Sequence, residues 1–112
     1  MDTAYDTKEQ LNPLLSAIDM LNKYGIKNQR IFVYCLIREL EDSYKRINDA
    51  KKMGINPFAQ PYRDFTPNQI IPQWQFDMAR WCNDKALLKT IDFKYYKPRK
   101  GFKCSEYFNT NK

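Results

Sequence analysis

The stretch Arg30-Ile31-Phe32-Val33-Tyr34-Cys35-Leu36-Ile37 decides the fold. It is a short, continuous run of β-branched and aromatic residues that is apolar on both faces. Such a run is typical of a buried parallel strand, because helices then cover both sides of the sheet. We therefore predict a strand buried on both faces here, with Cys35 packed as a small hydrophobic side chain.

A helix is predicted before this strand. Its apolar positions recur at three- and four-residue steps and form one face; they are Leu11, Leu14, Leu15, Ile18 and Leu21. Gly25 ends the helix. Its start has two interpretations: a capping box of Thr7 and Gln10, or Asn12 as the N-cap with Pro13 at the first helical position.

A second helix is predicted after the strand, with Leu40 and Met53 at the two ends of its apolar stripe. Acidic residues lie at its start and lysines at its end, as the helix dipole favours. Gly54 ends it. Here Lys52-Met53-Gly54-Ile55-Asn56 repeats Lys23-Tyr24-Gly25-Ile26-Lys27, at a spacing of about 30 residues, which is the length of a βα unit.

The second copy leads into Pro57-Phe58-Ala59-Gln60-Pro61-Tyr62. Its two prolines predict either a strand at a sheet edge or a strand end where no ladder donor is needed. Residues 63–72 read as a loop and 73–82, with Trp74 and Trp81, as a third helix. Residues 86–91 are apolar but unassigned, and 98–112 read as an irregular tail.

Composition restricts the function. The chain has 112 residues, which suits one domain, and it has no histidine and only three cysteines. Without histidine or a CxxC motif, the usual zinc sites and Ser–His or Cys–His catalytic pairs are excluded. No metal site, membrane span or signal peptide is expected, and the free thiols indicate a reducing, cytoplasmic location. Cys104 is expected to be the exposed thiol.

The order of these segments resembles the later part of a radical S-adenosylmethionine (radical SAM) barrel. The resemblance rests on Tyr24-Gly25-Ile26, the strand at 31–37, Leu40-Glu41-Asp42-Ser43-Tyr44-Lys45-Arg46-Ile47, Met53-Gly54-Ile55-Asn56-Pro57-Phe58, Pro61-Tyr62-Arg63-Asp64 and Ala79-Arg80-Trp81-Cys82-Asn83. It is diffuse and covers about residues 6–96. It implies an α/β fold with parallel strands and flanking helices, half of a partial (β/α)6 TIM-like barrel, over residues 1–92. Residues 93–112 form a basic aromatic tail.

Enzymes of this family bind a [4Fe–4S] cluster through a CxxxCxxC loop and cleave S-adenosylmethionine to a radical. This chain has no such motif. The resemblance therefore implies that the cluster and the cofactor belong to a parent protein, whose N-terminal half-barrel is the missing partner unless the chain self-associates. The chain alone would not be catalytic, and its catalytic residues and the parent's substrate are unknown.

The resemblance also implies site residues. The family's GxIxGxxE pattern aligns with residues 34–41, where Leu36 and Glu41 match but Tyr34 and Arg38 replace both glycines. The expected cofactor-binding residues are Leu36, Ile37, Glu41, Gln60 and Tyr62. Because the carboxyl ends of barrel strands form the active face, the expected substrate face is Arg38, Glu39, Arg63 and Asp64. These residues also have structural alternatives: core packing for Leu36, Ile37 and Tyr62, a favourable helix dipole for Glu41, and surface ion pairs for Arg38, Arg63 and Asp64.

Two other functions compete with this one. Lys94-Tyr95-Tyr96-Lys97-Pro98-Arg99-Lys100-Gly101-Phe102-Lys103 combines cations with rings, a pattern that suits phosphates and bases, so a nucleic-acid or anion-binding module is the alternative. A solvated basic tail would look the same. A receiver-type signalling domain is disfavoured, because no acidic cluster follows a first strand.

Overall fold

The computed structural model describes residues 2–4, 11–62, 67–68 and 70–109. Its centre is a pair of parallel six-residue strands, β2 (Phe32–Ile37) and β3 (Asn56–Pro61), paired from Phe32↔Asn56 to Ile37↔Pro61. A short strand, β1 (Asp2–Ala4), pairs in parallel with the other edge of β2, so the order is β1-β2-β3. The predicted α/β fold, with parallel strands and flanking helices, is confirmed.

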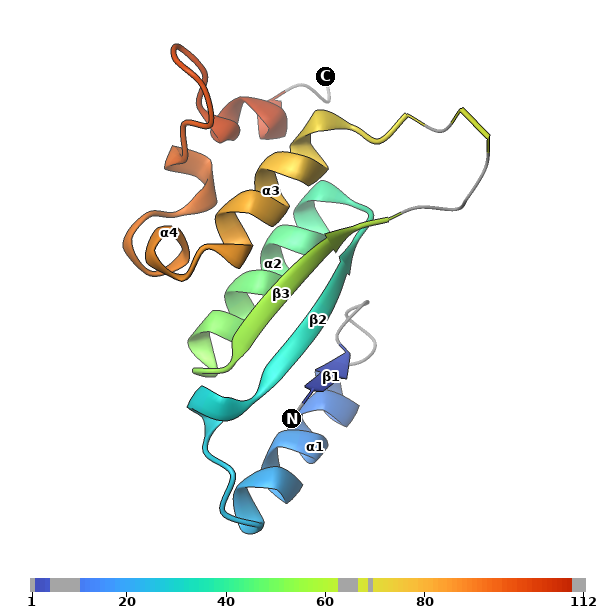
Figure 1. Cartoon of the computed structure of the whole chain (residues 1–112), viewed down its shortest axis with the longest axis vertical. Coiled ribbons are helices and arrows are strands. Elements are labelled where there is room, and N and C mark those ends of the chain that lie inside the picture. Colours follow the sequence, from blue (N-terminus) through green and yellow to red (C-terminus); the bar gives the residue numbers. More distant parts are fainter. Residues whose placement is uncertain (1, 5–10, 63–66, 69, 110–112) are drawn as a thin grey trace.

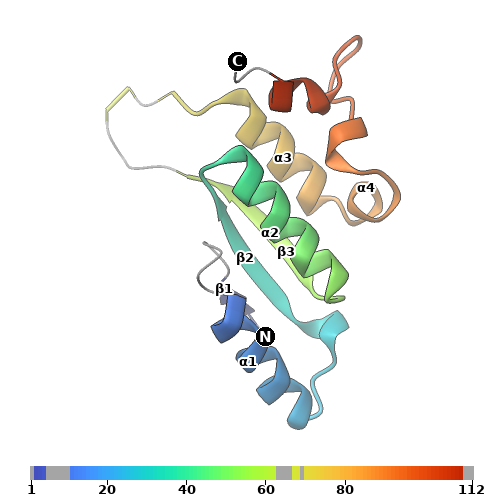
Figure 2. The same ribbon diagram turned by 180° about the vertical axis from the view of Figure 1, so that it is seen from behind.

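The helices lie between and after the strands. They are α1 (Leu11–Lys23), α2 (Leu40–Lys52), α3 (Gln73–Asn83) and α4 (Lys85–Thr90). Figures 1 and 2 show α1 and α2 against the same face of the sheet. α1 begins at Leu11, so Pro13 lies in its first turn, where proline is tolerated. The unassigned segment is α4, whose first turn is capped by Asp84.

The sequence repeat forms the same turn twice. Gly25 and Gly54 have φ of +87° and +78°, a region that glycine enters without steric cost. At each turn the glycine N–H donates to the carbonyl of the next-to-last helix residue, Asn22 or Lys51. The N–H of the following isoleucine reaches the carbonyl one residue further back: Ile26 to Leu21 at 3.0 Å and Ile55 to Ala50 at 3.2 Å. This is the Schellman motif, so the glycines end both helices as predicted.

Among the described residues, helices cover one face of β2 and leave the other partly exposed. Val33, Cys35 and Ile37 point into the core and are fully buried, whereas Phe32 and Tyr34 on the other face are 38% and 44% exposed. The expectation of burial on both faces is therefore wrong for this chain. The reason is topological: right-handed connections between neighbouring strands in sequential order place each helix on the same side.

The outer edge of β3 is closed. Asn56 donates its backbone N–H to the Ile31 carbonyl, directly before β2, and Tyr62 donates to the Ile37 carbonyl of β2. The backbone groups of the odd-numbered residues between them therefore point away from β2. Two of these, Pro57 and Pro61, have no N–H. The third, Ala59, gives its N–H to the Asn83 side chain at 2.8 Å and accepts from it at 3.0 Å. The predicted edge position is confirmed, and this edge offers no free N–H from residues 57–61 to a further strand.

The C-terminal segment folds back onto α3 instead of forming an irregular tail. It contains two short 3-10 helices, η3 (Phe93–Tyr95) and η4 (Cys104–Asn109). Asp77 on α3, 1% exposed, accepts from Arg99 at 3.0 and 3.1 Å and from the Tyr107 hydroxyl at 2.5 Å. This buried carboxylate fastens the segment to the domain.

The three cysteines are free and buried. Cys104 is 0% exposed, so the expectation that it is an exposed thiol is wrong. Burial, followed by the nearby Asp77 carboxylate, raises the pKa of Cys104 to about 12. No helix among the described residues is long and apolar enough to cross a membrane.

Candidate functional site

The uncovered face of the sheet carries aromatic side chains at its amino-terminal end. We call the residues that alternate onto it the open face: Phe32, Tyr34, Leu36 and Arg38 from β2 and its end, and Asn56, Phe58, Gln60 and Tyr62 from β3 and its end. Tyr34 and Phe58 are register partners, and their rings meet edge-to-face at 5.8 Å. Tyr34 and Phe58 are 44% and 45% exposed, so a large part of each ring reaches solvent.

The carboxyl-terminal end of the open face is more polar. Leu36 lies opposite Gln60, and beyond them the Arg38 guanidinium stacks over the Tyr62 ring at 4.2 Å from its centroid. A cation held over a ring keeps its N–H groups free in the plane of the guanidinium. The open face therefore changes from apolar rings to a cation, an amide and a hydroxyl along the strand direction.

A buried arginine on α2 holds the carboxyl-terminal end of β2 in place. Arg46 on α2 is 1% exposed and donates to the Leu36 carbonyl at 2.9 Å and to the Asp42 carboxylate at 2.9 Å. The Leu36 carbonyl lies beyond the last residue that β1 pairs with, so the side chain takes the place of a strand partner. Sequence reasoning assigned no role to Arg46, because nothing in its helical position signals burial.

The structure brings together four of the nine predicted site residues. Leu36, Arg38, Gln60 and Tyr62 share the open face. Ile37 alternates to the opposite face and is fully buried in the core, so its expected cofactor contact is not supported by its position.

The other predicted residues lie elsewhere. Glu39 is the N-cap position of α2, and Glu41 is in the first turn of that helix. Both line a groove along the outer side of α2, not the open face. The expected positions Arg63 and Asp64 lie outside the described residues.

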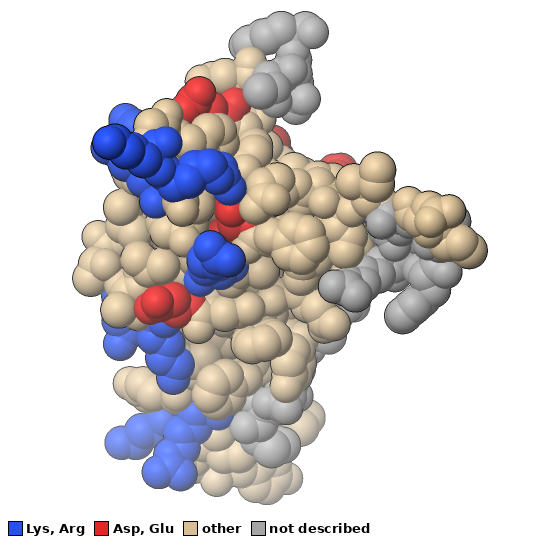
Figure 3. Space-filling model, turned by 45° about the horizontal axis from the view of Figure 1, so that its top comes forward, with Lys and Arg blue, Asp and Glu red and all other residues tan. Residues whose placement is uncertain are grey.

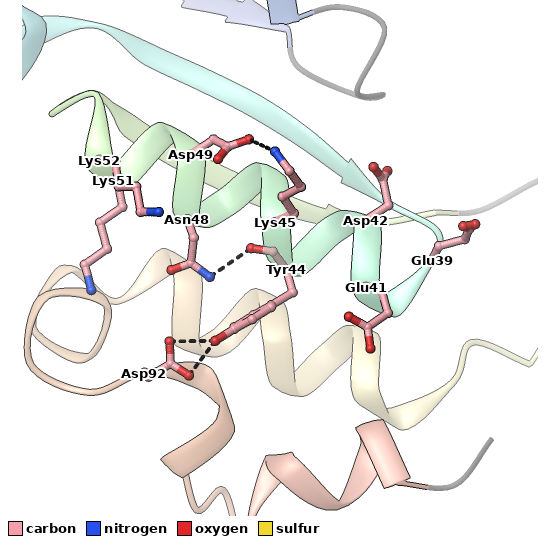
Figure 4. A pocket seen from close by; sticks show the side chains of 10 residues that line it. All are labelled: Glu39, Glu41, Asp42, Tyr44, Lys45, Asn48, Asp49, Lys51, Lys52 and Asp92. Carbon is pink, nitrogen blue, oxygen red and sulfur yellow. Dashed lines mark hydrogen bonds and ion pairs between the residues drawn. The ribbon is translucent and has the colours of Figure 1, made fainter. Parts of the chain in front are cut away.

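A groove of about 1040 Å³ runs along α2, apart from the open face (Figure 4). Its acids lie at the start of α2 and its lysines at the end. Tyr44 donates to both carboxylate oxygens of Asp92 at 2.7 and 2.8 Å, and Lys45 pairs with Asp49 at 2.8 Å. Burial and the Asp92 carboxylate raise the pKa of Tyr44 well above its usual value. These hydrogen bonds and this ion pair are made within an open helix surface, as is usual on a solvent-facing side of a helix.

The cysteines do not form a metal or cluster site. They lie on β2, α3 and η4, and the part of the chain that the structure describes contains no group of three or more Cys, Asp or Glu side chains placed to hold a metal. Three thiolates on one loop are what a [4Fe–4S] cluster of the expected type needs. Comparisons with protein-family models, characterised proteins and solved structures find no match to this chain.

Proposed function

We propose that this chain supplies the carboxyl-terminal half of a radical SAM barrel, and that its open face lines the cofactor and substrate side of that barrel. The observation that carries the proposal is a parallel sheet in sequential order, with helices on one face (Figure 1). The other face carries exposed rings. In a barrel the second face is the interior, so the exposed surfaces of Tyr34 and Phe58 would pack against the missing half.

The two edges of the sheet differ in whether a further strand could pair with them. The β3 edge is closed by its prolines and by the Asn83 carboxamide, whereas β1 pairs with β2 alone among the described strands. Further strands would therefore add beside β1. Strands added there would fit an open barrel in which β3 is the last strand.

The residues present fit part of the cofactor chemistry. Leu36 and the neighbouring rings offer an apolar surface of the kind a purine base packs against, and Arg38, Gln60 and Tyr62 offer polar groups at the strand ends. They do not fit the cluster, since the thiols are buried on separate elements. The parent's cluster would generate the radical, while these residues would orient the cofactor and exclude water around it.

The test uses the protein expressed from its whole reading frame and reconstituted anaerobically. Leu36→Asp places a charge at the proposed adenine surface and should weaken S-adenosylmethionine binding at least tenfold in equilibrium dialysis. Met20→Asp is the matched control, because Met20 is 60% exposed on α1, away from the open face.

A Leu36→Asp protein that binds the cofactor as tightly as the Met20→Asp protein would overturn the assignment of the open face. Thermal unfolding of both variants separates lost binding from lost folding. A whole protein that assembles no cluster under these conditions would overturn the assignment to radical SAM chemistry.

A further inference from the structure

The basic segment near the C-terminus is a fixed structure. We call residues 97–103 the basic turn. The bridge between Arg99 and Phe102 closes it, with Gly101 at φ of +79°, and the Cys104 N–H bonds to the Tyr96 carbonyl at 2.9 Å. Since Tyr96 and Cys104 are buried, the turn is held at a defined position on the domain.

The turn presents uncompensated positive charge. Lys97, Lys100 and Lys103 are exposed, and no ion pair joins them to an acid among the described residues. The buried Asp77 carboxylate pairs with Arg99, so its negative charge does not compensate the three lysines. Glu106 is the neighbouring exposed acid, and it accepts from the Lys103 backbone N–H at 3.2 Å. Figure 3 shows basic side chains gathered at the upper left, over this C-terminal part of the molecule.

An exposed ring accompanies these cations. Tyr95 is 64% exposed, and the Lys103 ammonium lies 5.9 Å from its ring centroid. The other apolar side chains between residues 93 and 103 are buried or half-buried, so they do not offer an insertion surface for lipid. An exposed aromatic ring beside cations suits an unpaired base next to its phosphates.

We propose that Tyr95 and the lysines of the basic turn bind single-stranded nucleic acid. Tyr95 stacks on one base, and Lys97, Lys100 and Lys103 contact neighbouring phosphates. This goes beyond the proposed barrel function and does not depend on it, because the surface lies on η3 and the basic turn and includes no residue of the open face.

The first measurement is the affinity of the chain for a fluorescent twelve-nucleotide oligo-uridine, by anisotropy at several salt concentrations. Three phosphate contacts predict a slope of about −2 in log K against log salt, since each contributes about −0.7 on single strands. Affinity should then fall roughly 20-fold when salt rises fourfold. The triple variant K97A/K100A/K103A should lose most of this slope. K27A/K52A/K89A removes equal charge from exposed positions elsewhere and should keep it.

The ring is tested separately. Tyr95→Ala should weaken binding about fivefold or more, as the loss of one stacked base predicts, while Tyr95→Phe should bind as the original chain does. Equal losses in the two lysine triple variants would show attraction by net charge alone and would overturn the proposal. Equal affinity for duplex RNA, or tighter binding to anionic phospholipid vesicles, would overturn the choice of a single strand.

Discussion

Asp77 is the residue whose replacement we expect to disturb the C-terminal segment most. It is buried, and its carboxylate accepts from the half-exposed Arg99, from Tyr107 and from Gln73. Hydrogen bonds to a charged group contribute about 1.5–3 kcal/mol when buried, and an exposed ion-pair partner contributes less than about 1 kcal/mol. The cost of burying the charge offsets part of this sum. For Asp77→Ala we therefore expect a loss of about 2–4 kcal/mol in the free energy of unfolding.

The assay combines urea denaturation with limited trypsin digestion. Asp77→Ala should lower the urea midpoint and open residues 97–103 to trypsin, because the contacts that hold the basic turn are gone. The urea midpoint of Asp77→Asn should lie between those of the original protein and Asp77→Ala, since asparagine keeps an acceptor oxygen but not the charge. Asp19→Ala is the control, as it removes an exposed i,i+4 pair with Lys23 that contributes about 0.5 kcal/mol or less. An Asp77→Ala protein that unfolds within about 1 kcal/mol of the original, with the turn still resistant to trypsin, would refute the reasoning.

Four other outcomes are expected. The three thiols should resist a thiol reagent in the native protein and react only on unfolding; rapid native labelling of Cys104 would contradict its burial. Burial and then the hydrogen bond to Asp77 raise the pKa of Tyr107 from 10.0 to about 12. The protonated Tyr107 hydroxyl should therefore stabilise the fold fully below pH 10.0, and this stabilisation should be lost as pH rises toward 12. Tyr107→Phe should lack that loss when unfolding is measured across this range. Asn83→Leu should cost about 1–2 kcal/mol in urea denaturation and promote aggregation through the uncapped edge of β3, and an unchanged midpoint would contradict its role. The isolated chain should self-associate in sedimentation analysis, and Tyr34→Lys with Phe58→Lys should keep it monomeric; a strictly monomeric original chain would count against the open face needing a cover.

Local signals predicted much of the fold. Gly25 and Gly54 marked both helix ends, because a left-handed turn residue is a property of the local sequence. Pro57 and Pro61 marked the edge strand for a similarly local reason, the missing N–H. Such features need no knowledge of distant partners.

Features set by distant contacts were missed or misjudged. The residues at 30–37 do not reveal what the second face of the strand meets, and in the structure Phe32 and Tyr34 on that face stay partly exposed. Cys104 lies among charged neighbours in sequence, yet Asp77 and Arg99, which are 22 positions apart, fold it into the core. Asn83 lies directly after the predicted helix at 73–82, and nothing in its local sequence signals that its side chain closes the edge of β3.

The candidate site was predicted in part for the same reason. Strand alternation places Leu36 and Ile37 on opposite faces, so only one of the two can lie on the open face. The stacking of Arg38 on Tyr62 joins two strand ends and is invisible to a motif within either one.

The central claim is that a preceding half-barrel completes the open face. The most direct measurement is the coding sequence immediately upstream of the Met1 codon. The account predicts a continuous reading frame of about a hundred codons, three βα units of about 30 residues each, that contains CxxxCxxC. A stop codon and a ribosome-binding site directly ahead of Met1 would contradict it.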